Sequence, residues 1–386
     1  MLSDVCAAVG RTAKFAISMG MARPREILAN YPLVLDRCDS LTFDERSQAL
    51  AYLILHLPDR YCRVFQVLEA LLVRGMLPLG RNGAVFAAVD IGAGPGPGIF
   101  AVRNFYAALS HVTTQTQGTP VATLGVTAIV ERSRGMSSAM HHFAEQLIQT
   151  EQGPRPHQSA TETLHVPHPY AIELAASATP FGASYEDFEN LDLRGEHNRA
   201  RHQIAHRLED ELDIGLQYAG QLAYEEPIGV PSGYAIALMT NFLTTTDAVP
   251  KFSDAVRRLM NGALVPGGIV LVLGGIGQQY PQIYEQLDRI ATNSGLHVMS
   301  GFDEPLQAGN RPEELEKLQT ITRQTWVELA TRAGGNAVVD VMHQLHTLKA
   351  GDILDESLPY RLPRFRVRAY RRGRWPTDDI ARTTSI

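Results

Sequence analysis

The sequence has few cysteines, and those it has are far apart. Cys6, Cys38 and Cys62 form no CxxC pair and are odd in number, so the sequence predicts neither a disulfide framework nor a cysteine-ligated metal site. No run of about 18 apolar residues is present to span a bilayer. The amino-terminal residues lack the compact apolar core of a secretory signal. These absences indicate a cytoplasmic protein in a reducing compartment, with no membrane association.

An excess of positive charge is also missing. The 386 residues include 35 Lys and Arg against 41 Asp and Glu, which is a formal net charge of -6. This balance does not favour nucleic-acid binding by the surface as a whole, although a local basic patch can still bind it. The length is sufficient for one large α/β domain with additions, or for two domains.

Apolar residues recur at helical spacing in the first part of the chain. Between Leu41 and Leu79 they follow the period of an amphipathic helix, and the turn at 78–83 then ends the pattern. The sequence therefore predicts an N-terminal helical region over residues 1–83.

Short apolar runs then alternate with helical patterns over 84–149 and again over 233–375. We expect strands at 84–91, 122–130, 233–239, 268–273, 297–300 and 364–370, helices at 99–109, 133–148, 250–261 and 281–293, and one or two helices within 313–348. This alternation requires a parallel sheet with helices on its faces. The predicted fold class is α/β, with a Rossmann-like doubly wound sheet.

Residues 150–232 interrupt the alternation. The range 150–184 is rich in Pro, His, Thr and Ser and shows no period, whereas 185–212 is strongly charged and predicts a helix. We interpret the whole range as a lid-like insertion into the sheet domain, and residues 376–386 as a flexible tail.

A glycine-rich turn lies between the first expected strand and the helix after it. Residues 89–98 are Val-Asp-Ile-Gly-Ala-Gly-Pro-Gly-Pro-Gly. Glycines let the backbone turn tightly and approach a ligand, and the N–H groups of the helix start face that ligand. The turn therefore predicts a nucleotide-like ligand, and the alternative is a glycine-rich turn that holds none.

Two common nucleotide-binding motifs do not fit this turn. A dinucleotide fingerprint needs Gly at its first, third and sixth positions. Counted from Gly92 the sixth position is Pro97, and counted from Gly94 it is Ile99. A phosphate-binding P-loop would need Gly-Lys-Ser/Thr, which does not follow. A nicotinamide-dependent oxidoreductase is therefore disfavoured.

The spacing of Asp90, Gly92, Gly94 and Gly96 resembles the acidic-x-Gly-x-Gly-x-Gly signature of class I methyltransferases, which use S-adenosylmethionine (SAM). The resemblance implies that the loop passes under the methionine part of SAM and that Asp90 helps to hold its ammonium group. It implies a class I methyltransferase sheet formed by residues 84–149 and 233–375. SAM carries no phosphate, so the loop need not be a phosphate cradle.

Two further positions match this family. Glu131 ends the second expected strand, where a carboxylate can accept hydrogen bonds from ribose hydroxyls, and its alternative is a solvated strand end. Asn241 follows the family's fourth strand and is the polar residue best placed to face the cleft, although it can equally cap the next turn. The predicted cofactor-binding residues are Asp90, Gly92, Ala93, Gly94, Pro95, Gly96, Glu131, Arg132, Ser133 and Asn241.

Within the superfamily, the chain resembles the mitochondrial-type ribosomal small-subunit methyltransferase-like family. The residues that carry this resemblance are 57–61 (Leu-Pro-Asp-Arg-Tyr), 67–69 (Val-Leu-Glu), the glycine loop, 130–133 (Val-Glu-Arg-Ser) with Met136, and 241–243 (Asn-Phe-Leu). The cysteine cluster of that family is absent. Tyr61, His168 and Phe242 are our candidate substrate contacts.

Two other groups of residues have both a functional and a structural interpretation. His197, His202 and His206 have spacing that permits a metal site, but the arginines between them favour an exposed charged helix, and we predict no metal. Seven arginines occur from Arg361 to Arg374. They are consistent with a strand that contacts phosphates or an acidic partner, and equally with a solvated edge strand.

The sequence thus predicts a SAM-dependent methyltransferase. The acceptor is a small molecule, a peptide or ribosomal RNA, and an assembly factor that binds SAM without turnover is a further alternative. No catalytic base is singled out, no Asn-Pro-Pro-Tyr motif identifies the target atom, and the oligomeric state stays open.

Overall fold

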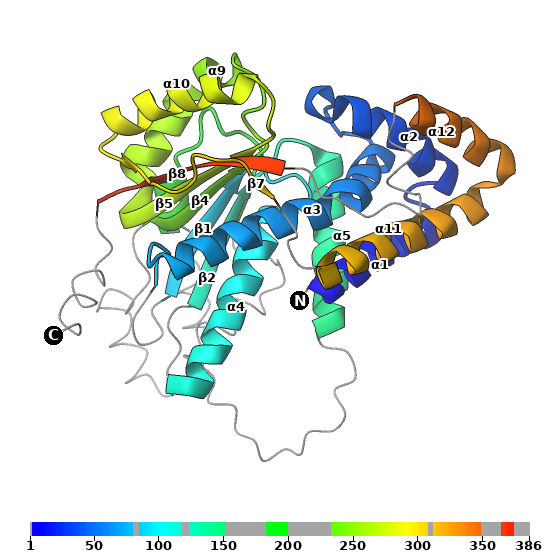
Figure 1. Cartoon of the computed structure of the whole chain (residues 1–386), viewed down its shortest axis with the longest axis horizontal. Helices are drawn as coiled ribbons and strands as arrows, with labels where there is room; N and C mark the ends of the chain where they lie inside the picture. Colours follow the sequence, from blue (N-terminus) through cyan, green and yellow to red (C-terminus); the bar gives the residue numbers. More distant parts are fainter. Residues whose placement is uncertain are drawn as a thin grey trace.

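A twisted sheet with helices on both faces forms one part of the molecule, and a group of helices covers one end of it (Figure 1). The computed structural model describes residues 2–79, 85–117, 123–151, 183–199, 233–307, 312–348 and 364–373. This is the α/β, Rossmann-like arrangement that the sequence predicted.

The sheet has the strand order β3-β2-β1-β4-β5-β8-β6, and the short strand β7 pairs with β8. The strands are β1 Val85–Ile91, β2 Thr123–Val130, β3 Ala183–Tyr185, β4 Tyr234–Thr240, β5 Leu264–Gly274, β6 His297–Val298, β7 Leu306–Gln307 and β8 Arg364–Arg371. Strands β1 to β5 are parallel, whereas β8 runs antiparallel between β5 and β6. An antiparallel strand at this place distinguishes the sheet from the six-stranded parallel dinucleotide order.

The central strands carry apolar residues on both faces. All seven residues of β4 are buried, as expected for a parallel strand covered by helices on both sides. Along β1, Ala88 packs into one apolar core and its neighbours Ala87 and Val89 into another. Because successive side chains of a strand point to opposite faces, the sheet separates these two cores.

The helices that cover the first face are α3 (Arg46–Val73), α4 (Pro97–Gln117) and α5 (Arg134–Glu151). Those on the second face are α9 (Ala248–Arg258), which continues into the π-helical turn η2 (Leu259–Ala263), and α10 (Gln279–Asn293). None of the helices in the described residues is long and apolar enough to cross a membrane.

The helices at one end of the sheet come from both ends of the chain. They are α1 (Leu2–Ser18), α2 (Pro24–Arg37), the 3-10 turn η1 (Cys38–Ser40), α11 (Pro312–Ala333) and α12 (Gly335–Thr347). Lys14 of α1 forms an ion pair with Glu328 of α11 at 2.9 Å, and the ring centroids of Tyr31 and Trp326 are 5.6 Å apart. The N-terminal helices that the sequence predicted therefore pack with two C-terminal helices that the sequence had grouped with the sheet (Figure 1).

Two expected elements differ from the structure. β3 lies within the range interpreted as a lid, and the helix expected from residue 185 begins only at 193. A three-residue strand is too short to produce a detectable period, so the sequence did not reveal it. The strand expected at 268–273 begins earlier, because β5 starts at Leu264 and includes Gly267 at φ +77°.

The first turn of α5 packs against the segment that precedes α3. The hydroxyl of Ser133 donates a hydrogen bond to the carbonyl of Phe43 at 2.6 Å. At Gly135, a Cβ would come closer to the Phe43 carbonyl oxygen than real contacts allow. The absence of a side chain at Gly135 therefore lets the helical group meet the sheet at this point.

We predict that Gly135→Ala lowers the free energy of unfolding by about 1–3 kcal/mol, because the added methyl group must displace backbone. Urea denaturation measures the change. Gly262→Ala is the control, since a Cβ there would meet nothing within 4 Å. An equal effect of the two substitutions would contradict the close packing at Gly135.

Candidate functional site

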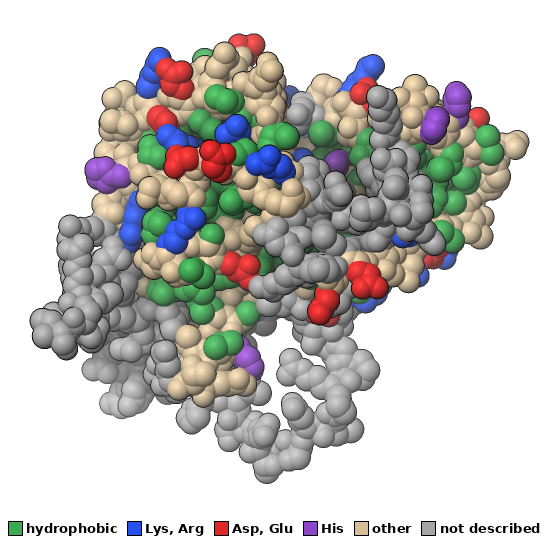
Figure 2. Space-filling model, viewed as in Figure 1, with side chains coloured by type: hydrophobic (Ala, Val, Ile, Leu, Met, Phe, Trp, Pro, Cys, Tyr) green, Lys and Arg blue, Asp and Glu red, His purple; other side chains and the backbone are tan. Residues whose placement is uncertain are grey.

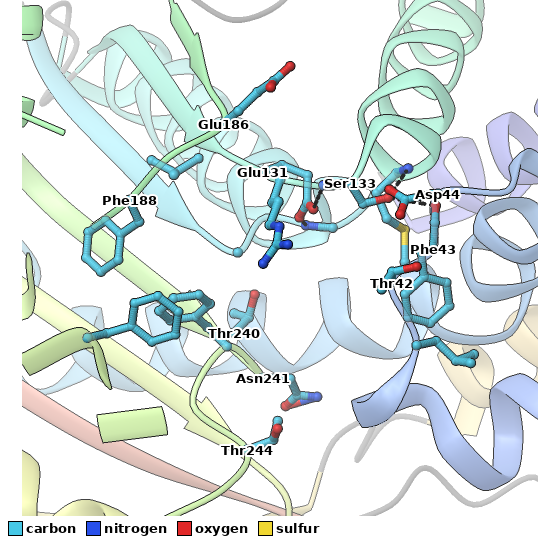
Figure 3. A pocket seen from close by; sticks show the side chains of 18 of the residues that line it. Thr42, Phe43, Asp44, Glu131, Ser133, Glu186, Phe188, Thr240, Asn241 and Thr244 are labelled. Atoms are coloured by element: carbon cyan, nitrogen blue, oxygen red, sulfur yellow. Dashed lines mark hydrogen bonds between the residues drawn. The ribbon is translucent and has the colours of Figure 1, made fainter. Parts of the chain in front are cut away.

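A cavity of about 690 Å³ opens at the carboxyl ends of β1, β2, β3 and β4 (Figure 3). This is the point where the strand order reverses between β1 and β4, which is the usual ligand position in open α/β sheets. The walls come from the glycine loop, 130–133, 186–189, 240–244, Lys251 and Phe252, and from 38 and 41–44 with Tyr52 and Met136.

Three glycines of the loop have left-handed backbone conformations. Their φ angles are +67° at Gly92, +56° at Gly94 and +84° at Gly96. A Cβ at Gly92 would collide with the ring of Phe242, and one at Gly96 would collide with Phe100. At Gly94 a Cβ would meet nothing within 4 Å. Gly92 and Gly94 line the cavity, and Gly94 is therefore the position where the backbone faces open space.

Asp90 lies beneath this loop and does not line the cavity. Its side chain is fully buried, and Oδ2 accepts a hydrogen bond from the backbone N–H of Ile99 at 3.1 Å. Burial and, to a smaller extent, the nearby charge of Glu131 raise the pKa of Asp90 to about 8. Asp90 thus ties β1 to the first turn of α4, and in the described part of the chain its Oδ1 has no hydrogen-bond partner.

Glu131 joins the glycine loop to the start of α5. Its Oε2 accepts a hydrogen bond from the N–H of Gly94 at 2.7 Å, and its Oε1 accepts one from the N–H of Ser133 at 2.7 Å. Burial raises the pKa of Glu131, and these backbone donors oppose the rise. A carboxylate has about four lone-pair sites, so Glu131 keeps acceptor capacity toward the cavity.

Ser133 caps α5. Its hydroxyl accepts a hydrogen bond from the N–H of Met136 at 3.1 Å, the third residue of the helix. Arg132, beside it, is exposed at the cavity wall. Both residues therefore lie where the sequence expected cofactor contacts.

Asn241 lies at the cavity on the other side of the glycine loop. Its φ is +53°, and its N–H donates a hydrogen bond to the carbonyl of Leu273 at 2.8 Å. Asparagine tolerates this left-handed conformation better than most residues. Figure 3 shows the side chains of Asn241 and Thr244 together, across the cavity from Glu131 and Ser133.

Aromatic rings form one wall of the cavity. The ring centroids of Phe242 and Phe252 are 4.7 Å apart, and those of Phe188 and Phe242 are 5.6 Å apart. Phe242, a candidate substrate contact from the sequence, therefore lies at the cavity. Its ring also packs on Gly92 and covers the first glycine of the loop.

The sequence did not reveal three of the walls. These are residues 38 and 41–44 with Tyr52, the residues 186–189 after β3, and Lys251 with Phe252. Recognition of β3 would have pointed to Glu186 and Asp187, since they follow a parallel strand as Glu131 does. The other two walls depend on long-range packing, for which the sequence carries no local signal.

The described cavity wall is acidic. Its carboxylates are Asp44, Glu131, Glu186, Asp187 and Glu189, and its basic side chains are Arg132 and Lys251. Acidic walls attract cations and repel phosphates.

Several predicted residues lie elsewhere. Tyr61 is 2% exposed and accepts a hydrogen bond from Asn104 Nδ2 at 3.1 Å between α3 and α4, away from the cavity. Ala93, Pro95 and Gly96 are buried within the loop and do not line the cavity. His168 falls in a range that the structure does not describe.

The structure also places His197 of the histidine group and the arginine-rich strand β8. His197 is 1% exposed beside Tyr234, whereas His202 and His206 are not described, and the described residues contain no group of three His, Cys, Asp or Glu suited to a metal ion. β8 pairs on both sides, so the solvated edge strand is wrong.

Arg368 of β8 is paired with acidic side chains of its own chain. Arg368 Nε donates a hydrogen bond to Asp288 Oδ1 at 2.8 Å, and Asp303 lies 3.9 Å from the same guanidinium group. On the face in Figure 2, basic and acidic side chains lie interspersed over this region. The charge of Arg368 is thus compensated within the chain.

No protein-family model matches the chain, and no curated protein matches its sequence. Among solved structures, the chain is similar to a SAM-dependent methyltransferase from Geobacter sulfurreducens in complex with S-adenosyl-L-homocysteine. The identity is 11%, the match covers 80% of this chain and 89% of that one, and the TM-score is 0.34.

Two further similarities are of the same kind. Phosphoethanolamine N-methyltransferase 2 from Haemonchus contortus, in complex with phosphomonomethylethanolamine and S-adenosylhomocysteine, is 13% identical, with 86% of this chain and 60% of that one covered and a TM-score of 0.34. The CcbJ methyltransferase from Streptomyces caelestis is 12% identical, with 82% and 89% covered and a TM-score of 0.30. Because all these TM-scores lie below one half, function has to be inferred from the residues of the cavity.

Asp90 generates a prediction about pH. Its pKa is raised from 3.8 to about 8 in the folded chain, so the folded state holds this proton more tightly than the unfolded state does. The free energy of unfolding should therefore fall as pH rises from about 4 to about 8, and Asp90→Asn should remove at least about 1 kcal/mol of that fall.

Urea denaturation at pH 5 and pH 8 measures the difference between Asp90→Asn and the unmodified protein. Asp340→Asn, at an exposed position of α12, is the control and should follow the unmodified protein. If the Asp90→Asn and unmodified curves run parallel, Asp90 is ionised in the folded state and the prediction fails.

Proposed function

We propose that this chain binds SAM in the cavity and transfers its methyl group to an acceptor. The observation that carries the proposal is the glycine loop after β1, with left-handed Gly92, Gly94 and Gly96, held by the carboxylate of Glu131 at the end of β2. The antiparallel β8 between β5 and β6 further supports a methyltransferase sheet over a dinucleotide-binding one.

The cavity residues fit this cofactor chemically. Gly94 exposes backbone to open space, which leaves room for the methionine part, and Glu131 offers acceptor capacity for ribose hydroxyls. The rings of Phe188, Phe242 and Phe252 provide an apolar wall for a purine. The acidic wall suits a ligand that carries a sulfonium and an ammonium group.

When bound, SAM supplies an electrophilic methyl group on its sulfonium. The tasks of the protein are to place the acceptor in line with the departing sulfur and to exclude water. Asn241 and Thr244, across the cavity from Glu131, are the polar side chains that we assign to orienting the acceptor. We assign no general base, because one is required only when the acceptor must lose a proton.

The acceptor that the cavity favours is a small molecule or a peptide. Five carboxylates against two basic side chains would repel an RNA backbone from the described wall. The ribosomal alternatives, an RNA methyltransferase or an assembly factor that binds SAM without turnover, rest on the sequence resemblance at 57–61 and 130–133.

The cofactor can be tested by isothermal titration with SAM and with NAD. We expect SAM but not NAD to bind, and Gly94→Asn to weaken SAM binding at least about tenfold, because its side chain would enter the cavity. Asparagine tolerates the left-handed conformation, so the backbone is little strained.

Gly75→Asn is the matched control. Gly75 has φ +66°, is exposed after α3, and has nothing within 4 Å of a Cβ. The Gly75→Asn variant should bind SAM as tightly as the unmodified protein does. Failure of the folded, unmodified protein to bind SAM would overturn the proposed function.

The acceptor class can be tested by the salt dependence of methyl transfer from labelled SAM. With pools of small metabolites or peptides as acceptors, we expect transfer to change little between 50 and 200 mM salt. An RNA enzyme that makes 6–10 phosphate contacts would lose about 10³-fold or more in affinity over this range. Transfer to purified ribosomal RNA that falls steeply with salt would reverse our assignment.

A further inference from the structure

One face of α3 extends polar side chains away from the cavity wall. Tyr52 lines the cavity, and the ring of His56 lies 4.8 Å from that of Tyr52, centroid to centroid. Arg60 follows after one more turn. Residues four apart lie on the same helix face, so the three side chains form a continuous strip.

The strip contains polar groups that lack partners. His56 Nε2 and Arg60 Nε are buried without a hydrogen-bond partner, and among the described residues Arg60 forms no ion pair. The neighbouring carboxylate of Asp59 is already engaged, because it accepts two hydrogen bonds from Arg63 at 3.0 and 2.6 Å. A buried guanidinium nitrogen that lacks a hydrogen-bond partner is costly.

Arg60 and Arg63 share the single carboxylate of Asp59, and the other groups close to Arg60 are Cys38, Tyr52 and Tyr280. Burial, together with Arg60 and Arg63, lowers the pKa of His56 to about 3, so that imidazole is neutral. Burial opposes the charge of Arg60, but the four groups around it together raise its pKa, so its guanidinium group is charged.

Arg60 does not itself line the cavity, but it lies close to residues that do. Cys38 and Tyr52 are cavity residues, and Tyr280 packs on Gly274 and Gly275 at the carboxyl end of β5. β5 is the neighbour of β4, after which Asn241 lies. The carboxylates at 186–189 follow β3, which β2, β1 and β4 separate from β5 in the sheet.

We propose that Arg60, with His56 beside it, binds an anionic oxygen group, a carboxylate or a phosphate, of a ligand in the cavity. The inference rests on the proposed function. A guanidinium group can bind either anion with two parallel hydrogen bonds, and neutral imidazole can donate one more. Both the carboxylate of SAM and an anionic group of the acceptor present this chemistry.

The experiment compares S-adenosylhomocysteine with 5′-methylthioadenosine, which has the same nucleoside but no carboxylate. If Arg60 binds the cofactor carboxylate, Arg60→Gln should weaken the binding of S-adenosylhomocysteine about tenfold or more. The binding of 5′-methylthioadenosine should stay unchanged. Arg60→Lys should retain part of the affinity. Arg25→Gln, at an exposed position of α2, is the control and should change neither ligand.

The second arm tests an anionic acceptor. Phosphate and acetate, compared with chloride at equal ionic strength, should raise the melting temperature of the protein saturated with S-adenosylhomocysteine. Arg60→Gln should lose this increase, whereas Arg25→Gln should keep it. His56→Phe preserves the ring against Tyr52 but removes the hydrogen-bond donor. It should reduce the carboxylate-dependent affinity or the rise in melting temperature, whichever of the two is observed. This variant keeps the test available if Arg60→Gln does not fold.

Unchanged behaviour of Arg60→Gln in both arms would overturn the inference while leaving the proposed function intact. Equal weakening of the binding of both nucleosides would also overturn the inference, since the carboxylate that only one of them carries could not then explain the weakening. If the unmodified protein binds neither nucleoside, the proposed cofactor fails, and the phosphate and acetate arm, run without nucleoside, decides the inference alone.

Discussion

The carboxylate of Glu131 is the interaction on which the site depends. It accepts hydrogen bonds from Gly94 in the loop after β1 and from Ser133 at the start of α5. Ser133 in turn donates to the carbonyl of Phe43, in the segment before α3. One chain of hydrogen bonds therefore holds together a strand end, a loop, a helix start and the edge of the helical group. The cavity lies where these parts meet.

The electrostatics of the cavity divide along the sheet. Carboxylates gather after β2 and β3, whereas the partly buried Arg60 lies outside the cavity lining, close to Tyr280 beside the end of β5. A ligand with a positive part at one end and a negative part at the other would match both regions. This division favours a small zwitterionic or mixed-charge guest over a polyanion, whose regularly spaced phosphates would meet the carboxylates.

The sequence placed some residues of the site correctly and others wrongly. The glycine loop, Glu131, Ser133 and Asn241 were placed correctly at the carboxyl ends of strands, because local patterns define a strand end and the turn after it. Tyr61 was grouped with the site through a resemblance, but the structure buries it between two helices, where it accepts a hydrogen bond from Asn104. β8 showed the alternation of a strand, but alternation cannot distinguish an edge strand from one that is paired on both sides.

The sequence by itself determined the α/β class, the left-handed glycine loop and the carboxylate beside it, since each depends on residues that are neighbours along the chain. Only the tertiary structure decided that Asp90 lies beneath the loop, that α11 and α12 join the N-terminal helices, and that Arg60 Nε is buried without a hydrogen-bond partner. These features depend on contacts between residues far apart in the chain, where packing of apolar faces, and not local propensity, selects the arrangement.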